Sequence, residues 1–176
     1  GVYEDADQIL WIGTNSGGLN RFDPRSGEWR HYLNDPDDPH SLSNNSVFKI
    51  YQDSRGLFWI GTFDGLNRFD PQTETFETQP IAGAFFDAFE DSSGLLWFAS
   101  NAGLISFDRQ TGVWDRFLYD TTDPHSLSTN GLLVIYEDSA GRLWLGTING
   151  GLNRYDRVTR QFERFLNDPA NPKSLS

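Results

Sequence analysis

The stretch Leu10-Trp11-Ile12-Gly13-Thr14, or LWIGT, is the most informative part of the sequence, because three close copies of it follow within 176 residues. It returns as FWIGT at 58–62, as LWFAS at 96–100 and as LWLGT at 143–147. The four tryptophans are therefore separated by 48, 38 and 47 residues. An internal period of this length indicates an architecture built from similar units placed side by side.

The words on either side of the tryptophan recur in the same order. An acidic turn precedes it each time: YEDADQ at 3–8, YQDSRG at 51–56, FEDSSG at 89–94 and YEDSAG at 136–141. A glycine turn follows it: GGLNRFDP at 17–24, DGLNRFDP at 64–71, AGLISFDR at 102–109 and GGLNRYDR at 150–157. Short aromatic and β-branched runs with Gly, Asp and Asn turns, at a period of about 40–48 residues, are typical of a β-propeller.

The second repeat predicts four strands, at 46–52, 57–62, 66–69 and 75–79. Its second strand is apolar on both faces, which a strand with one solvated face would not tolerate, so neighbouring units must cover both. The sequence predicts an all-β fold, a β-propeller of four consecutive four-stranded antiparallel blades. They form one domain over 1–176, with blades at approximately 1–33, 46–79, 84–118 and 131–166.

The repeats leave no strand over to close a ring by completing a shared blade. An open array of blades exposes an apolar face at each end, and such faces bind partners. We therefore expect either a segment of a larger propeller or a propeller completed by dimerisation through the end blades. Gly13, Gly61 and Gly146 follow the apolar strand, which indicates close backbone approach or a bulge. Ala99 takes this place in the third repeat, so the position demands a small side chain.

Composition excludes several classes of function. The formal net charge of −11 would repel a polyanion, so no nucleic-acid partner is expected. No apolar run approaches the roughly 18 residues that span a bilayer, so no membrane segment is expected in this chain. Cysteine is absent, which excludes disulfides and thiolate chemistry.

Three long connectors between repeats are alike: LNDPDDPHSLS at 33–43, LYDTTDPHSLS at 118–128 and LNDPANPKSLS at 166–176. In a four-stranded meander they emerge on the same rim as the turns at 14–18, 62–65, 100–103 and 147–150. Polar side chains there can form hydrogen bonds with a ligand, and Phe63 offers an aromatic ring for stacking. The candidate ligand-binding residues are Asn15, Ser16, Phe63, Asp64, Asn101, Asn149, His40 and His125.

Metal binding and catalysis have weaker support in the sequence. Asp35, Asp37 and Asp38 could ligate calcium, but Asp before Pro is ordinary turn chemistry and the EF-hand pattern is missing. His40 and His125 could bind a metal, yet Lys173 takes the same place in the third connector. The Glu-Asp pairs of the acidic turns recur, whereas a catalytic pair is needed once. We expect no metal, no cofactor and no catalytic residue.

The chain closely resembles the two-component regulator propeller repeat in four motifs and in their order. These are the acidic turn, the tryptophan-containing pentapeptide, GGLNR[FY]D and DPHSLS. That family occurs in tandem in periplasmic sensor regions of bacterial hybrid histidine kinases. The resemblance implies a non-catalytic, extracytoplasmic ligand-sensing module of a two-component-type receptor, periplasmic or extracellular, with any kinase activity in other domains. It also implies a small polar ligand such as an oligosaccharide. The alternative is a structural, protein-interaction propeller that forms a homodimer through its end blades.

Overall fold

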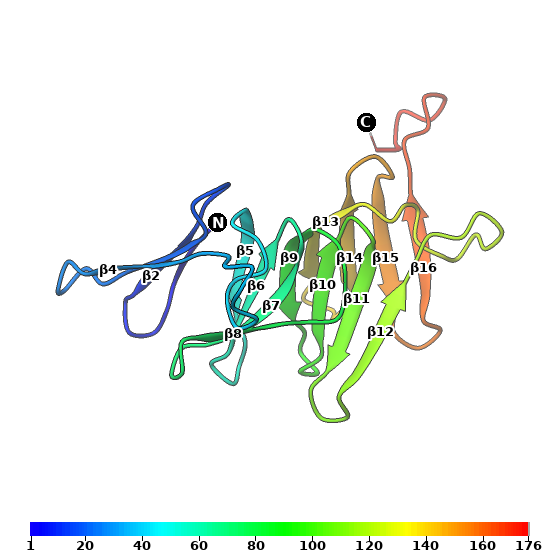
Figure 1. Cartoon of the computed structure of the whole chain (residues 1–176). Coiled ribbons are helices and arrows are strands. Elements are labelled where there is room, and N and C mark those ends of the chain that lie inside the picture. The colour runs from blue at the N-terminus through cyan, green and yellow to red at the C-terminus, as the bar shows by residue number, and fades with distance from the viewer. Residues whose placement is uncertain (176) are drawn as a thin grey trace. The chain divides into compact units, whose positions relative to one another are not determined.

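The computed structural model describes residues 1–175 (Figure 1). The regular secondary structure of these residues consists of β-strands. The sixteen strands form four separate four-stranded sheets, and within each sheet the strands follow one another in chain order. Neighbouring strands pair antiparallel. The predicted fold, four consecutive four-stranded blades, is confirmed. Across residues 1–175 there is no helix of a length and apolarity that would cross a membrane.

Each blade uses four consecutive strands. Blade 1 contains β1 (Val2–Glu4), β2 (Leu10–Gly13), β3 (Leu19–Phe22) and β4 (Trp29–Tyr32). Blade 2 contains β5 (Val47–Gln52), β6 (Phe58–Thr62), β7 (Gly65–Asp70) and β8 (Thr75–Thr78). Blade 3 contains β9 (Phe85–Glu90), β10 (Leu96–Ser100), β11 (Gly103–Asp108) and β12 (Val113–Phe117). Blade 4 contains β13 (Leu132–Glu137), β14 (Leu143–Thr147), β15 (Leu152–Asp156) and β16 (Gln161–Phe165).

The chain divides into two compact units, Gly1–Ala88 and Phe89–Ser176. Unit 1 contains blades 1 and 2 and the first residues of β9, and its core lies between the two blades. Unit 2 contains the remainder of blade 3 and blade 4, with an equivalent core between them. Whether the whole chain is one domain stays a prediction.

The second strand of blade 2 is buried along its whole length, as its sequence predicts. Phe58, Trp59 and Ile60 are each at most 1% exposed, although their side chains point to alternate faces of the sheet. Such a strand is stable only when both faces are covered, which explains its continuous apolar sequence. Full burial of one such side chain stabilises the fold by about 1.5–3 kcal/mol.

Every repeated tryptophan donates its indole N–H to the aspartate six residues before it. The four Nε1–Oδ2 distances are 2.8 Å for Trp11–Asp5, 2.9 Å for Trp59–Asp53, 2.6 Å for Trp97–Asp91 and 2.8 Å for Trp144–Asp138. The other carboxylate oxygen accepts two amides of the acidic turn, as from Arg55 and Leu57 in blade 2. The repeated aspartates are therefore structural, because each ties its turn to the next strand.

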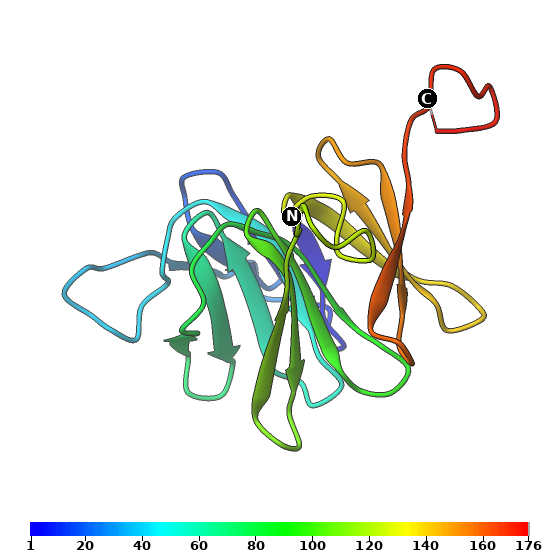
Figure 2. The same ribbon diagram turned by 90° about the vertical axis from the view of Figure 1, so that its right-hand side faces the viewer.

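The long connectors run along the outermost strand of the following blade. Phe76 of β8 donates its amide to the carbonyl of His40 at 3.0 Å, and Phe162 of β16 donates to the carbonyl of His125 at 2.7 Å. An outer strand covered in this way exposes fewer unpaired backbone N–H and C=O groups, which could otherwise pair with a strand of another chain and cause aggregation. After β16 the chain forms a similar loop outside the sheet (Figure 2), in which Asp168 donates its amide to Ser174 Oγ at 2.9 Å.

Candidate functional site

The rim of unit 1 brings two turns and a connector together. These are the turn at 14–18 in blade 1, the turn at 62–65 in blade 2, and residues 43–46, which lead from the end of the connector into β5. Ser46 joins them, because its hydroxyl donates to the Asn15 carbonyl at 2.5 Å and its carbonyl accepts from the Phe63 amide at 2.9 Å. In unit 1, connector and turns therefore share one rim, as the strand order requires.

Glycine shapes the turn in blade 1. Gly18 has a φ of +66°, and a Cβ there would lie 2.1 Å from the carbonyl oxygen of Tyr32. Only glycine combines this conformation with this close approach. Thr14 closes the turn, since its hydroxyl accepts the amide of Gly17 at 2.8 Å. The rim is thus held by backbone and threonine contacts, which leaves the side chains of Asn15 and Ser16 exposed.

A serine–asparagine latch fixes the end of each complete connector to the following blade. The Ser43 amide donates to Asn67 Oδ1 at 3.0 Å, and Asn67 Nδ2 donates to Ser43 Oγ at 2.8 Å. Ser128 and Asn153 repeat both contacts in unit 2, at 2.9 and 2.8 Å. Both asparagines are fully buried. Sequence reasoning missed this pairing, although the recurrence of SLS and LN in the same repeats was its signal.

Three phenylalanines from separate elements gather at the rim of unit 1. We call Phe48 of β5, Phe63 of the turn and Phe86 of β9 the aromatic cluster. Phe48 lies 5.4 Å from Phe86 in a stacked arrangement and 6.4 Å from Phe63 edge to face, measured between ring centroids. Phe63 is 62% exposed. The cluster therefore combines a partly buried aromatic base with a ring open to solvent.

A β-bulge places Phe48 in this cluster. Val47 pairs with Thr62 and Lys49 pairs with Gly61, so Phe48 is an extra residue in β5 without a partner on β6. A bulge turns the side chain of its extra residue away from the regular alternation. Leu133 holds the same place in β13, where the register also shifts, and the turn residue matching Phe63 is Ile148. The aromatic version of this pair is thus specific to unit 1.

Gly61 of β6 allows the backbone of β9 to approach closely beside this bulge. A Cβ at Gly61 would lie 2.7 Å from the Phe85 carbonyl oxygen, so the position demands a minimal side chain. Its φ is not in the left-handed region, and small size alone explains the glycine. This confirms the expected close approach at this position of the repeat.

An ion pair joins the two residues that follow Phe48 and Phe86 in the sequence. Lys49 Nζ on β5 is 2.7 Å from Asp87 Oδ1 on β9, and their side chains are 33% and 11% exposed. The pair joins neighbouring inner strands, and Asp87 Oδ1 also accepts the amide of Ala88 at 3.0 Å. The exposed Asp64, which follows Phe63 in the same turn, adds a carboxylate acceptor for hydroxyl groups next to the aromatic cluster.

All eight predicted site residues are exposed, but they occupy different environments. In unit 1, Ser46 bonds to the backbone of both Asn15 and Phe63 and so brings their two turns together. Ser16 follows Asn15 in the first turn, and Asp64 follows Phe63 in the second. His40 lies instead along the outer strand β8, through its carbonyl bond to Phe76.

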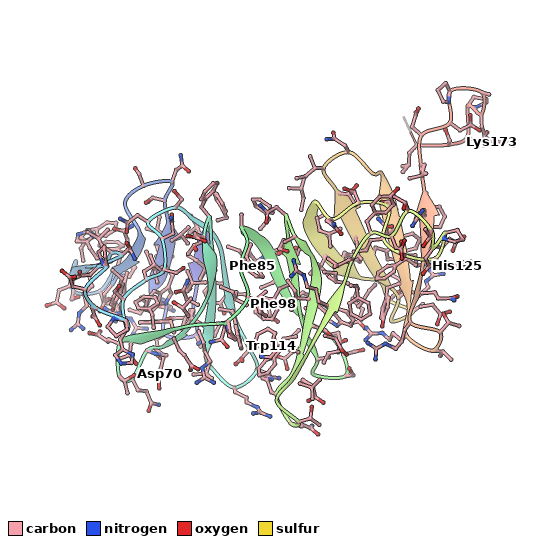
Figure 3. The ribbon with its side chains drawn as sticks, turned by 45° about the vertical axis from the view of Figure 1, so that its right-hand side comes forward. Asp70, Phe85, Phe98, Trp114, His125 and Lys173 are labelled. Atoms are coloured by element: carbon pink, nitrogen blue, oxygen red, sulfur yellow. The ribbon has the colours of Figure 1, made fainter. Side chains whose placement is uncertain are left out.

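Unit 2 carries the other three predicted residues. Asn101 lies on the turn after β10, at the position of Phe63 in blade 2. Asn149 lies on the turn after β14, at the position of Asp64. His125 lies on the connector beside β16, and Lys173 lies on the loop after β16 (Figure 3). Ligand binding by all eight residues stays a prediction.

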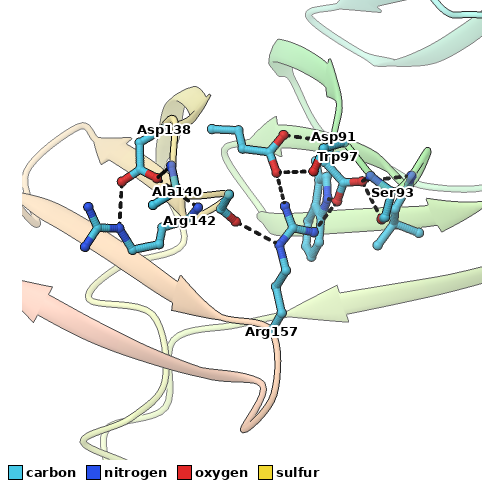
Figure 4. A network of polar contacts seen from close by, with 11 residues as sticks. Asp91, Ser93, Trp97, Asp138, Ala140, Arg142 and Arg157 are labelled. Carbon is cyan, nitrogen blue, oxygen red and sulfur yellow. Dashed lines mark hydrogen bonds and ion pairs between the residues drawn. The ribbon is translucent and has the colours of Figure 1, made fainter.

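A groove of about 270 Å³ in unit 2 combines aromatic and basic side chains, among them Trp97, Phe117, Tyr155, Arg157 and Arg160. Its arginines already have anionic partners. Arg157 binds Asp91 and Glu137, and Arg160 binds Asp115 (Figure 4 shows the Arg157 network). These contacts neutralise the arginines, so the groove is not a ready anion site.

Burial and hydrogen bonding act in opposite directions on Asp91. Burial would raise its pKa, but hydrogen bonds from Ser93, Arg157 and Trp97 hold the pKa below its ordinary value. At Asp138 the Trp144 indole is the largest cause of a lowered pKa, and Arg142 adds to it. Both carboxylates are therefore anionic at neutral pH and unsuited to act as general acids. Among residues 1–175, no three His, Asp or Glu side chains converge as metal ligands would.

Two segments of the chain match the family model described as the two component regulator propeller, at residues 41–64 and 126–149. Each segment runs from the end of a connector through the first strand and the acidic turn to the turn after the tryptophan-containing pentapeptide. Histidine kinase P4 from Formosa agariphila is 32% identical over 85 residues, which cover 48% of this chain and 6% of that protein. The matched segment is thus a small part of the length of that relative.

Solved structures share the fold. The extracellular domain of a hybrid two component system from B. thetaiotaomicron has a TM-score of 0.77 and 24% identity, over 92% of this chain and 22% of that chain. The extracellular domain of a one component system from B. thetaiotaomicron has a TM-score of 0.78 and 23% identity, over 98% and 25%. Virginiamycin B lyase from Staphylococcus aureus has a TM-score of 0.69 and 17% identity, over 96% and 55%. At these identities the likeness establishes the propeller fold alone.

Proposed function

This chain carries two-component regulator propeller repeats, and we propose that it is a non-catalytic, extracytoplasmic ligand-binding module of a two-component-type signalling receptor. The ligand is a neutral oligosaccharide, and it binds at the aromatic cluster of unit 1. The observation that carries the proposal is the exposed Phe63 ring beside the Phe48–Phe86 stack. The extracytoplasmic placement is supported by the extracellular domains that share this fold.

The aromatic cluster suits the two kinds of surface that a sugar presents. The C–H face of a pyranose packs against an aromatic ring, and the ring supplies large apolar area with few rotatable bonds. Hydroxyl groups need donors and acceptors, which the side chains of Asn15, Ser16 and Asp64 offer at the same rim. A net charge of −11 disfavours polyanionic ligands, so a neutral glycan is the favoured class.

Titration calorimetry with a panel of neutral oligosaccharides tests the proposal. We expect heat with at least one member, and we expect Phe63→Ala to weaken that binding by about tenfold or more, a loss of about 1.4 kcal/mol. Ile148→Ala is the matched control, because it truncates the equivalent turn position in blade 4 and should leave binding unchanged. Circular dichroism confirms that each variant is folded. Absence of heat with every sugar, or an equal loss in both variants, would overturn the proposal.

A further inference from the structure

Two equivalent grooves lie between the paired blades of the two units. In unit 1 a groove of about 360 Å³ lies beside Trp11, between blades 1 and 2, and in unit 2 the groove of about 270 Å³ lies beside Trp97. Each is bordered by the acidic turn of the first blade and by the turn between the last two strands of the second. Because consecutive strands run in opposite directions, these turns lie at the edge of the blades opposite the rim.

In unit 2 the chain occupies its groove with two of its own guanidinium groups. Arg157, on the turn between β15 and β16, donates to Asp91 Oδ2 of blade 3 and to Glu137 Oε1 at 2.7 Å (Figure 4). Arg160 of the same turn lies over the Phe117 ring, 5.3 Å from its centroid. The aspartate that binds the blade 3 tryptophan therefore also binds a cation from the next blade.

The same two positions in unit 1 carry no positive charge. The turns between β7 and β8 and between β15 and β16 have the same length, so Pro71 takes the place of Arg157. Glu74 takes the place of Arg160, and both residues have a positive φ, of 56° and 59°. The cations that this turn supplies in unit 2 are thus replaced in unit 1 by a neutral ring and a carboxylate.

Asp5 of unit 1 keeps the acceptor site that its counterpart Asp91 uses for arginine. Asp5 Oδ2 accepts the Trp11 indole N–H at 2.8 Å, and Oδ1 accepts the amides of Asp7 and Ile9, each at 3.0 Å. A carboxylate has about four acceptor sites, so three donors leave one for a further donor. Asp5 is partly buried and lines the groove, which places this site within it.

The charge of the groove in unit 1 favours a cation. Its lining contains four carboxylates and two guanidinium groups, from Asp5, Asp7, Asp23, Glu74, Arg21 and Arg25. The groove in unit 2 has the opposite balance, with two arginines and Asp115. An excess of carboxylates in a partly enclosed groove attracts cations. The described part of the chain has no group of three acidic or histidine side chains placed to hold a metal ion, so an organic cation is the better fit.

We propose that the groove of unit 1 binds the guanidinium group of an external ligand, with Asp5 as its acceptor. The group takes the place that Arg157 holds in unit 2. It belongs to free arginine or to an arginine side chain of another polypeptide. This site is independent of the proposed oligosaccharide site, because the aromatic cluster lies at the rim and the groove lies at the opposite edge.

Heteronuclear NMR of isotope-labelled protein, titrated with methylguanidinium, tests the site. The indole N–H of Trp11 is the reporter, because it donates to Asp5. We expect a saturable shift of this resonance at millimolar probe. The Trp97 indole should not respond, since its aspartate already binds Arg157. Arg157→Ala should make the Trp97 resonance respond as well.

Pro71→Arg supplies the guanidinium from within the chain and should weaken binding by about tenfold or more. Pro71→Ala is the matched control and should leave binding unchanged, and circular dichroism checks that both variants are folded. Tighter binding of free arginine than of N-acetylarginine methylamide supports a small ligand, and equal affinity supports a polypeptide side chain. A silent Trp11 resonance, an equal response of Trp97 in the wild type, or undiminished binding by Pro71→Arg overturns the proposal.

Discussion

The indole Nε1 of Trp59 donates a hydrogen bond of 2.9 Å to Oδ2 of Asp53, and both side chains are almost completely buried. Asp53 Oδ1 accepts two backbone amides of the same turn, so one carboxylate satisfies three donors. A hydrogen bond to a buried charged acceptor is stronger than a neutral one. The contact explains why aspartate and tryptophan recur six residues apart in all four blades.

Replacing Asp53 with alanine should lower the free energy of unfolding by about 2–4 kcal/mol, because the buried indole N–H of Trp59 and two partly buried backbone amides lose their acceptor. Urea denaturation followed by tryptophan fluorescence measures the loss. The exposed Asp7 of blade 1 provides the control, and Asp7→Ala should change stability by less than about 0.5 kcal/mol. Equal effects of the two substitutions would show that the buried contact contributes no stability of its own.

Arg157→Ala should destabilise unit 2 by about 3 kcal/mol, because the fully buried Asp91 carboxylate loses its cation. The substitution also removes the contact between Arg157 and Glu137 at 2.7 Å (Figure 4). Arg154→Ala is the control, since the Arg154–Glu163 pair lies at the surface and should be worth less than about 1 kcal/mol. Chemical denaturation of both variants checks the difference, and similar losses would contradict it.

The stability of unit 2 should fall in acid. The pKa values of Asp91 and Asp138 are lowered in the folded chain, while an unfolded aspartate titrates near pH 3.9. Their contribution is therefore fully present above about pH 4 and is lost as the pH falls through the lower folded values. Thermal melts between neutral and acidic pH measure this. The Asp91→Asn variant should show a shallower decline, and a decline as steep as that of the wild type would argue against this residue.

Gln8→Gly should stabilise blade 1 by about 1 kcal/mol. Gln8 has a φ of +64°, and the other acidic turns have glycine at this place, as at Gly56 with a φ of +83°. A side chain in this conformation costs about 1–2 kcal/mol. The reverse change, Gly56→Gln, should destabilise blade 2, although nothing lies within 4 Å of its added Cβ. Melting temperatures that move in the same direction would refute the backbone explanation.

Local features of the blades could be predicted from the sequence. The predicted strands at 46–52, 57–62, 66–69 and 75–79 match β5 to β8 within two residues at each end. Neighbouring strands in a meander are joined by short turns, so their pairing depends on hydrophobic periodicity and turn chemistry alone. The Trp59–Asp53 bond is local in the same sense, because it joins residues only six apart.

The candidate site could be predicted only in part. Placing Asn15 and Phe63 on one rim followed from strand order, which alternates the turns between the two edges of a blade. The position of His40 along β8 did not follow, because it depends on the path that the connector takes over the next blade. The serine–asparagine latch between Ser43 and Asn67 was also missed. These polar residues are 24 positions apart, and the sequence does not show that their side chains come within hydrogen-bond distance.

An array of four-stranded blades follows from the sequence alone, because a recurring strand that is apolar on both faces is compatible with few other architectures. Which side chains meet between blades is known only from the three-dimensional structure. The register shift that turns Phe48 toward Phe63 and the reach of Arg157 to Asp91 depend on how one sheet packs on the next. Those contacts join residues from separate strands, and the side chains of a whole interface set their geometry together.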